Sequence, residues 1–468
     1  MSCPSHFPPR VNKKMDKSAP YLHPLISSTH NFYIYPPTFI LLGTPNPKIH
    51  PKLSPLLMIM AHYYYHCDST SSSSSSSFSR DEWRSFRSTA SSKSNASNCE
   101  ERAIVPCYSH PHYHCVATLK TQNHHHITCL ATRNNLLYAA SGNDITVFDL
   151  STLKPIKGAF NGSDSSSAGF IKSIAFCDEK ILTAHQDSRI RVWKRHRLVN
   201  TLPTLKDKLR RFLSPKSYVQ VRRHKRKLWI QHNDAVSGLT VNNGFIYSVS
   251  WDKTLKIWRA SDFKCIESVT AHDDAVNAVT VAVTGRVYTG SADGSIRIWE
   301  RDDEVGRHTM VDTLGKHSST VNALALSKDG KVLLSGGCDG VIVAWERERG
   351  SDRMVASGVV GGHDGPVLCL ISLDGHDLFV SGSADRTVRI WGRGESGGWG
   401  SFCCLAVMEG HRRPVRSLAA VPSESESNGV VSVCSGSLDG EIKIWRVTVS
   451  ELVKAHHRVQ WKEDVLHD

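Results

Sequence analysis

Histidine, a hydroxyl residue and aspartate recur together along this 468-residue chain. These are the side-chain types of a nucleophilic triad, in which histidine takes a proton from serine and a carboxylate orients the histidine. A catalytic triad, however, occurs once, in one cleft, beside donors that stabilise an oxyanion. Here the set recurs five times at regular spacing, and each time a tryptophan follows the aspartate by six residues. We therefore interpret the groups as structural and predict that the protein is not an enzyme.

The five complete groups share one spacing. The hydroxyl precedes the aspartate by four residues, and the histidine precedes it by 20 to 28. In chain order the groups are His232, Ser248, Asp252 and Trp258; His272, Thr289, Asp293 and Trp299; His317, Ser335, Asp339 and Trp345; His363, Ser381, Asp385 and Trp391; and His411, Ser435, Asp439 and Trp445. An earlier group has Thr183, Asp187 and Trp193, but Ser167 stands where its histidine is expected.

The spacing of the tryptophans indicates the elements that hold these groups. Six segments end in Trp, separated by 65, 41, 46, 46 and 54 residues, and a degenerate unit ending at Phe148 precedes them, with Asn123 in place of histidine. A repeat of about 40–45 residues is typical of a four-stranded propeller blade. We predict an all-β fold, a seven-bladed β-propeller. The strand 116–120 is expected to pair with the last unit, which removes the open sheet edges.

The repeated residues resemble the WD40 family, and the resemblance implies that each group closes one polar network within its blade. A longer run, LWIQHNDAVSGLTVNNGFIYSVSWDKTLKIWRASD at 228–262, follows VRRHKRK and resembles plant WD40 proteins of the JINGUBANG type. That resemblance implies a plant developmental regulator, linked in that group to pollen germination and tube growth.

The resemblance also implies a partner-binding top face. In the family, contacts concentrate three and five residues after the histidine and one residue before the aspartate. The positions of this chain that we expect to bind partners are Trp251, Phe170, Lys172, Asn277, Asn322, Leu368, Arg416 and Leu438. Trp251 is the strongest candidate, because tryptophan and arginine carry a disproportionate share of interface energy. The alternative is that Trp251 packs against neighbouring loops.

The positive charge of the chain is concentrated in one segment. Residues 194–227 hold 13 of the 57 Lys and Arg and a single acidic residue, whereas the rest of the chain is nearly neutral. Within it, Leu205, Leu209, Phe212 and Leu213 share one face of a predicted helix that Thr204 caps and Pro215 ends. Such a helix suits an anionic lipid surface, an acidic partner or a calmodulin-like groove. Alternatively, its apolar face packs on the rim of the propeller.

A cluster of cations follows the predicted helix. This basic patch consists of Arg222, Arg223, Lys225, Arg226 and Lys227. It is typical of a nuclear-import signal or of a phosphate-binding patch. The possible partners of 194–227 are therefore an importin, an anionic membrane or a nucleic acid, and we expect the protein in the cytoplasm and the nucleus.

Composition divides the chain into four parts. Residues 1–57 contain 11 of the 19 prolines and are predicted to be a disordered extension. Residues 58–114 form a lead-in rich in Ser and His, 115–447 the propeller with its basic insertion at 194–227, and 448–468 a tail. No apolar run reaches the roughly 18 to 20 residues that a membrane-spanning helix needs.

Other patterns that resemble functional sites have weaker support. The run CYSHPHYHC at 107–115 has alternating histidines that suit zinc, but its two cysteines are farther apart than structural zinc sites usually have them. The glycines at 392, 394 and 397 match GxGxxG, but they follow a blade tryptophan instead of opening a helix. We predict no metal, no cofactor and no small-molecule substrate.

The sequence thus favours a monomeric, non-enzymatic scaffold that presents its top face to other proteins. The first alternative is a substrate adaptor for a cullin-RING ubiquitin ligase, whose motif in this family places Arg three residues after the blade tryptophan. Here those positions read His196, Ser261, Asp302, Glu348, Gly394 and Thr448, which speaks against the adaptor. The second alternative is direct binding of a membrane or a nucleic acid through 194–227.

Overall fold

The computed structural model describes residues 112–450, except 122–124, 159, 161–168, 223–224, 303, 374–377, 394–401 and 422–428. For 221, 222 and 225 it describes the backbone alone. The predicted extension 1–57, nearly all of the lead-in and most of the tail lie outside these residues. No helix within them is long and apolar enough to cross a membrane.

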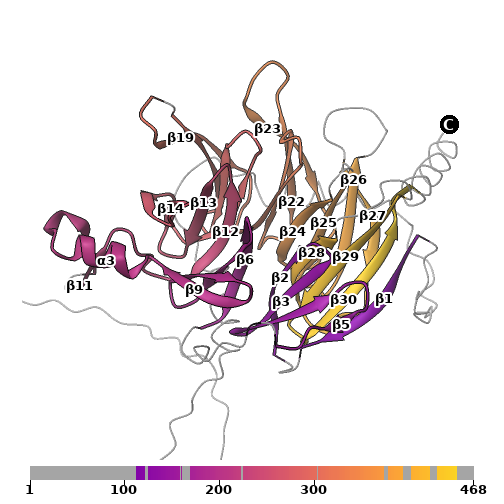
Figure 1. Cartoon of the computed structure of the whole chain (residues 1–468). Helices are drawn as coiled ribbons and strands as arrows, with labels where there is room; N and C mark the ends of the chain where they lie inside the picture. Colours follow the sequence, from indigo (N-terminus) through magenta and orange to yellow (C-terminus); the bar gives the residue numbers. More distant parts are fainter. Residues whose placement is uncertain are drawn as a thin grey trace, which may run out of the picture. The chain divides into compact units, whose positions relative to one another are not determined.

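Seven four-stranded antiparallel sheets form the seven blades (Figure 1). Blade 1 consists of β2 (Ile127–Arg133), β3 (Leu136–Ser141), β4 (Asp144–Asp149) and β5 (Lys154–Pro155). Blade 2 consists of β6 (Ile171–Cys177), β7 (Lys180–His185), β8 (Ile190–Lys194) and β9 (Arg197–Leu202). Blade 3 consists of β12 (Val236–Asn242), β13 (Phe245–Ser250), β14 (Thr254–Arg259) and β15 (Cys265–Thr270).

The remaining blades repeat this order. Blade 4 has β16 (Val276–Val281), β17 (Val287–Ser291), β18 (Ser295–Arg301) and β19 (His308–Gly315). Blade 5 has β20 (Val321–Leu326), β21 (Val332–Gly337), β22 (Ile342–Arg347) and β23 (Met354–Val360). Blade 6 has β24 (Val367–Leu373), β25 (Leu378–Ser383), β26 (Val388–Arg393) and β27 (Phe402–Met408). Blade 7 has β28 (Val415–Val421), β29 (Val430–Ser437), β30 (Glu441–Thr448) and, from the start of the described chain, β1 (Tyr113–Lys120).

The first strands of neighbouring blades contact one another all the way round, from β2 through β6, β12, β16, β20 and β24 to β28, which returns to β2. The prediction of a seven-bladed ring is therefore confirmed. The core is divided in the same way, because each of seven buried hydrophobic clusters is formed by two adjacent blades.

The blades approach each other too closely for a side chain at some positions. A Cβ at Gly336 would lie 2.5 Å from a methyl of Val367 in the next blade, and a Cβ at Gly436 would lie 2.5 Å from Ile127. Glycine at these places lets one blade pack directly on the apolar residue that opens the next blade's first strand.

Ring closure follows the sequence prediction. β1 pairs antiparallel with β30, with Tyr113 opposite Val447 and Lys120 opposite Glu441. Leu119 of β1 is buried in the hydrophobic cluster shared by blades 7 and 1. β1, the first strand of the described residues, therefore completes the last blade.

The predicted basic insertion begins too early in the chain. Residues 197–202 form β9, the fourth strand of blade 2, because pairing with β8 satisfies their backbone groups. The inserted part follows it: the helix α3 (Leu205–Phe212), the short 3₁₀ turn η2 (Pro215–Ser217) and the hairpin of β10 (Tyr218–Arg222) and β11 (Lys225–Leu228). The predicted helix and its Thr204 cap are confirmed. Its apolar face is exposed, so the alternative that this face packs on the rim is wrong.

Candidate functional site

The structure brings the four repeated side chains together inside single blades. In blade 3, His232 Nε2 lies 2.8 Å from Ser248 Oγ, and Trp258 Nε1 donates to the same oxygen at 2.9 Å. His232 Nδ1 lies 3.3 Å from the Asp252 carboxylate, which also accepts the backbone N–H of Asn233 at 2.6 Å. Because a carboxylate only accepts, Nδ1 of the neutral histidine carries the proton and Nε2 accepts from the hydroxyl.

The other four groups have the same geometry. The distances from histidine Nε2 to the hydroxyl are 2.8, 2.8, 2.6 and 2.8 Å in blades 4 to 7. The indole donates to that hydroxyl at 3.0, 2.9, 2.7 and 2.8 Å. All five hydroxyl residues are fully buried. Each hydroxyl is bonded to its own histidine and indole and has no access to a substrate, so the arrangement is a structural tetrad.

Four of the five tetrads hold their aspartate ionised. Burial by itself raises the pKa of Asp252, but His232 and hydrogen bonds from Thr254 and Asn233 outweigh it and bring the pKa well below its usual range. The same balance lowers the pKa of three further tetrad aspartates, Asp293, Asp385 and Asp439.

Blade 2 uses a different histidine, which sequence reasoning missed. His185 Nε2 lies 2.8 Å from Thr183 Oγ1, and Trp193 Nε1 donates to that oxygen at 2.9 Å. Thr183 and His185 are two residues apart on β7, so they face the same side of the strand. This two-residue spacing is the sequence signal from which the pairing of His185 with Thr183 could have been predicted. Burial, and then the charge of Arg191, lower the pKa of His185 to about 4.

Blade 1 lacks the tetrad. The pairing of β3 with β4 places Ala139 and Phe148 where other blades have the hydroxyl and the tryptophan. Both are buried. Loss of donor and acceptor together leaves no orphaned polar group, so such a replacement costs little. Asn123, the expected substitute for histidine, lies outside the described residues.

Five of the eight predicted partner-binding residues share a backbone feature. In every first strand the pairing register shifts after the opening residue, as between Ile171 and Ser173. A bulge of this kind redirects the side chain that it leaves unpaired. The residues so placed, one in each blade, are Thr128, Lys172, Ser237, Asn277, Asn322, Leu368 and Arg416. We call these seven positions the bulge ring.

Several bulge-ring side chains fasten adjacent blades. Asn277 Nδ2 donates to the Val321 carbonyl of the next blade at 3.2 Å, and Asn322 Nδ2 donates to the Val367 carbonyl at 3.0 Å. Arg416 Nη1 donates to the Leu368 carbonyl at 3.2 Å. Asn322 and Leu368 are themselves buried, which leaves little of either side chain for a partner.

Trp251 lies between two bulge-ring residues. Its Nε1 donates to Asn277 Oδ1 at 3.2 Å, and Lys172 Nζ lies 4.9 Å from the centre of its indole. The indole is half-buried. Burial, and then the charge of Arg416, lower the pKa of Lys172 to about 8. At one end of the ring of blades, the Lys172 ammonium thus lies over an indole, and the charge of Arg416 acts on that ammonium.

Phe170 and Leu438, the other predicted contacts, lie next to this end. The Phe170 ring would be 3.7 Å from a Cβ at Gly142. The Leu438 carbonyl accepts a hydrogen bond from His126 Nδ1 at 2.5 Å. In the basic patch, Arg226 is exposed and Lys227 half-buried, whereas Arg223 and the side chains of Arg222 and Lys225 are not described.

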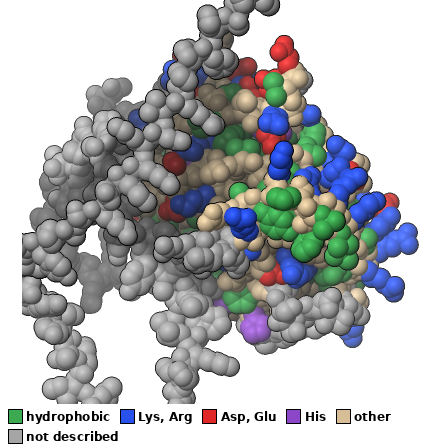
Figure 2. All heavy atoms as spheres, turned by 90° about the vertical axis from the view of Figure 1, so that its left-hand side faces the viewer, with side chains coloured by type: hydrophobic (Ala, Val, Ile, Leu, Met, Phe, Trp, Pro, Cys, Tyr) green, Lys and Arg blue, Asp and Glu red, His purple; other side chains and the backbone are tan. Residues whose placement is uncertain are grey.

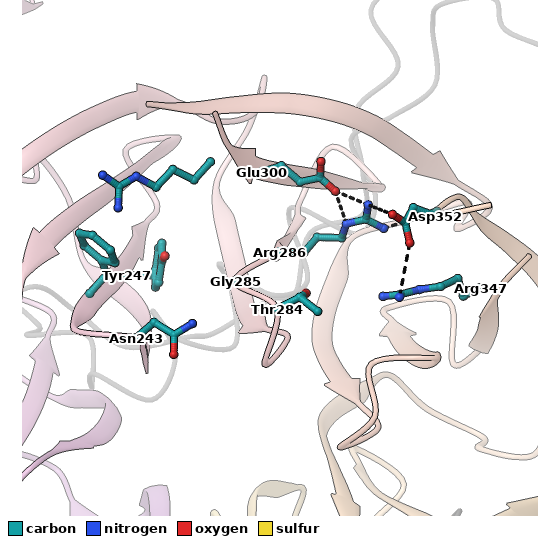
Figure 3. A pocket seen from close by; sticks show the side chains of 10 residues that line it. Asn243, Tyr247, Thr284, Gly285, Arg286, Glu300, Arg347 and Asp352 are labelled. Carbon is teal, nitrogen blue, oxygen red and sulfur yellow. Dashed lines mark hydrogen bonds and ion pairs between the residues drawn. The ribbon is translucent and has the colours of Figure 1, made fainter. Parts of the chain in front are cut away.

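A cavity of about 390 Å³ lies at the opposite end of blades 3 to 5 (Figure 3). Two of its three arginines are paired with carboxylates. Arg286 forms ion pairs with Glu300 and Asp352, and Arg347 lies 3.5 Å from Asp352. In the described part of the chain, no group of three or more His, Cys, Asp or Glu side chains is placed to hold a metal ion.

Comparison with known families agrees with this geometry. The family "WD domain, G-beta repeat" matches residues 224–259, 263–300, 308–346, 355–392 and 402–446. The chain carries WD40 repeats. The matched segments cover blades 3 to 7, which are the five blades with a complete tetrad. WD40 propeller proteins generally act as protein-interaction scaffolds.

Curated relatives match over short stretches. Autophagy-related protein 16 of Arabidopsis thaliana is 29% identical over 110 residues, 22% of this chain and 21% of that protein. Small ribosomal subunit protein RACK1 of Drosophila melanogaster is 30% identical over 101 residues, 20% of this chain and 30% of that protein. An F-box/WD-40 repeat-containing protein of Arabidopsis thaliana is 29% identical over 110 residues, 24% of this chain and 19% of that protein. The chain thus spans less than a third of the length of each of these relatives.

Proposed function

We propose that this protein is a non-enzymatic scaffold that binds a partner protein at the bulge-ring end of the propeller. The observation that carries the proposal is Trp251, a half-buried indole held between Lys172 of blade 2 and Asn277 of blade 4. An aromatic side chain that is already fixed by its neighbours loses little conformational entropy when it contacts a partner.

The charge at this end suggests the chemistry of the partner. The charge of Arg416 helps to lower the pKa of Lys172, so the two cations lie close enough to repel each other. A carboxylate from a partner would relieve that repulsion, and complementary charge accelerates association. We infer that the partner presents an acidic side chain beside an apolar one, the acid for Lys172 and Arg416 and the apolar group for Trp251.

The resemblance to plant proteins of the JINGUBANG type supports a finer proposal. We propose a monomeric developmental regulator of the pollen germination and tube growth type, acting in the cytoplasm and the nucleus. Among the alternatives, the cullin-RING adaptor receives no support from the positions after the blade tryptophans, which hold residues such as Asp302 and Glu348 instead of Arg.

Substitution of Trp251 tests the scaffold proposal. Partner proteins captured from pollen by the wild-type chain are quantified against Trp251→Ala and Lys172→Glu. We expect capture of a specific partner to fall by about 30-fold or more for Trp251→Ala, because a hot-spot residue contributes roughly 2 kcal/mol or more. The melting temperature is expected to change little.

Phe245→Ala is the matched control. Phe245 also lies beneath a cation, with Arg301 4.7 Å from the centre of its ring, but at the opposite end of the blades. It should leave capture unchanged. Equal capture by the wild type and Trp251→Ala would refute the proposal, and a large drop in the melting temperature would assign Trp251 to packing between blades.

A further inference from the structure

The helix α3 presents its apolar side to solvent. Leu205 is 73% exposed, Leu209 63% and Phe212 64%, and Leu213, the residue after the helix, is 86% exposed. At 100° per residue these four side chains share one face. A surface helix normally buries such a face against the core.

The other side of α3 holds it against the protein. Arg211 lies 4.5 Å from the centre of the Trp229 indole, next to the hairpin. Tyr218 Oη donates to the Phe212 carbonyl at 3.0 Å, and Thr204 Oγ1 accepts the N–H of Asp207 at the N-terminus. The helix is thus fixed by its polar side, and the orientation of its apolar side is set in advance.

Exposed cations lie on the same helix and on the segment that follows it. Lys206 and Arg210 are exposed on α3, and Lys216 and Arg226 are exposed on the segment that follows. Asp207, the one acidic residue of the insertion, lies in the first turn of the helix, where its carboxylate accepts a hydrogen bond from Thr204 Oγ1, and it is half-buried. Figure 2 views the side of the chain that carries α3 and shows hydrophobic side chains gathered there, with Lys and Arg beside them.

We propose that α3 and the β10–β11 hairpin form a docking surface for an anionic lipid bilayer. Leucine and phenylalanine side chains bury in the acyl region of a membrane interface, while lysine and arginine remain with the anionic headgroups. Both features are on one prefolded surface here. None of its residues belongs to the bulge ring, so the proposal does not depend on the function proposed above.

Other occupants fit the surface less well. A nucleic acid offers phosphates for the cations but no hydrocarbon for Leu205, Leu209, Phe212 and Leu213. A calmodulin-like groove surrounds a helix, whereas the polar side of α3 is already occupied by Trp229 and Tyr218. Only the apolar side of α3 is accessible to a partner. A membrane interface, which is flat and contacts a helix from one side, matches this arrangement.

The experiment is co-sedimentation of the full-length protein with vesicles of phosphatidylcholine alone or mixed with phosphatidylserine. We expect the wild type to bind the mixed vesicles and not the neutral ones. Both Leu209→Ser/Phe212→Ser and Lys206→Gln/Arg210→Gln should lower the affinity on the order of tenfold or more, since each exposed cation contributes roughly 1 kcal/mol and each buried methylene about 0.8 kcal/mol.

Two controls match these changes elsewhere on the blades. Val283→Ser replaces a 73% exposed apolar residue, and Lys331→Gln/Arg353→Gln removes two cations that are 72% and 70% exposed. Both controls should bind mixed vesicles as the wild type does. Three results would each overturn the proposal: equal binding to neutral and anionic vesicles, unchanged binding by Leu209→Ser/Phe212→Ser, or binding to duplex DNA or polyglutamate with none to vesicles.

Discussion

Each tetrad hydroxyl joins two side chains from different parts of its blade. Ser248 Oγ is bonded to an imidazole from the loop before β12 and to an indole from β14, in a fully buried position. A buried group that loses its only partner costs more than the bond itself contributes, because water cannot replace the partner. The hydroxyl is therefore the member whose removal affects both neighbours.

Ser248→Ala tests this role. The change leaves His232 Nε2 and the Trp258 N–H without their shared partner, and we expect the free energy of unfolding to fall by about 1–3 kcal/mol. Chemical denaturation measures it. Ser261→Ala, at an exposed position between blade strands, should have no measurable effect, and an equally stable Ser248→Ala protein would contradict the structural role of the tetrad.

His185 makes stability depend on pH. Burial lowers its pKa from 6.5 to about 4, so between these pH values the unfolded chain binds more protons than the folded one, and the free energy of unfolding falls as the pH falls. The loss across this window is up to roughly 3 kcal/mol. At still lower pH, the tetrad aspartates with lowered pKa values continue the loss.

His185→Gln should flatten this part of the profile. The free energy of unfolding, measured from pH 7.5 to 4, is expected to fall less steeply in the variant than in the wild type. His125→Gln, at an exposed histidine, should keep the wild-type slope. Identical slopes for His185→Gln and the wild type would show that His185 does not titrate as its burial implies.

Among the structural elements, β1 joins the beginning of the described chain to its end by pairing with β30. Leu119→Asp places a charge in the cluster between blades 7 and 1, where Leu119 is 9% exposed. We expect the free energy of unfolding to fall by about 3 kcal/mol or more. Val116→Asp, on the same strand at 38% exposure, should have a small effect. Equal melting temperatures for the two variants would contradict the closing role of β1.

The blades and their closure could be predicted from the sequence because they rest on local, repeated signals. The six tryptophans fix the register of the third strands, and Val116–Lys120 is a strand with no other partner before the first unit. The early part of the basic insertion was misassigned because Arg197 of β9 follows Lys194 and Arg195 in the sequence, and an outer strand exposed to solvent tolerates charge. Charge alone could not separate the blade from the insertion.

The candidate site was only partly predictable for a similar reason. The positions of Lys172, Asn277 and Arg416 come from repeat alignment, but the sequence does not show the bulge that redirects them. Nor does it show that Asn322 and Leu368 are buried. The exposure of the apolar face of α3 could not be predicted. An amphipathic pattern shows which residues share a helix face, but it does not show whether that face packs on the protein or lies in solvent.

At the scale of the whole molecule, the excess of positive charge belongs to one segment, because 194–227 holds 13 of the 57 Lys and Arg and only one acidic residue. We propose that the basic patch also directs nuclear import. Charge reversal of its five cations, Arg222, Arg223, Lys225, Arg226 and Lys227, should lower the nuclear share of the protein in imaged pollen cells. Lys331→Glu/Arg353→Glu is the matched control, and an unchanged distribution of the patch variant would remove the import proposal.

The pairing of Lys120 with Glu441 also has a consequence for synthesis. A ribosome makes β1 first and must add more than 300 further residues before β30 leaves the exit tunnel. During that time the incomplete ring has two unpaired ends, one at β1 and one at the blade made last. A product that stops before β30 keeps both ends unpaired. A nonsense mutation before β30 therefore removes the strand with which β1 pairs. The truncated product loses the closure of the ring as well as part of blade 7.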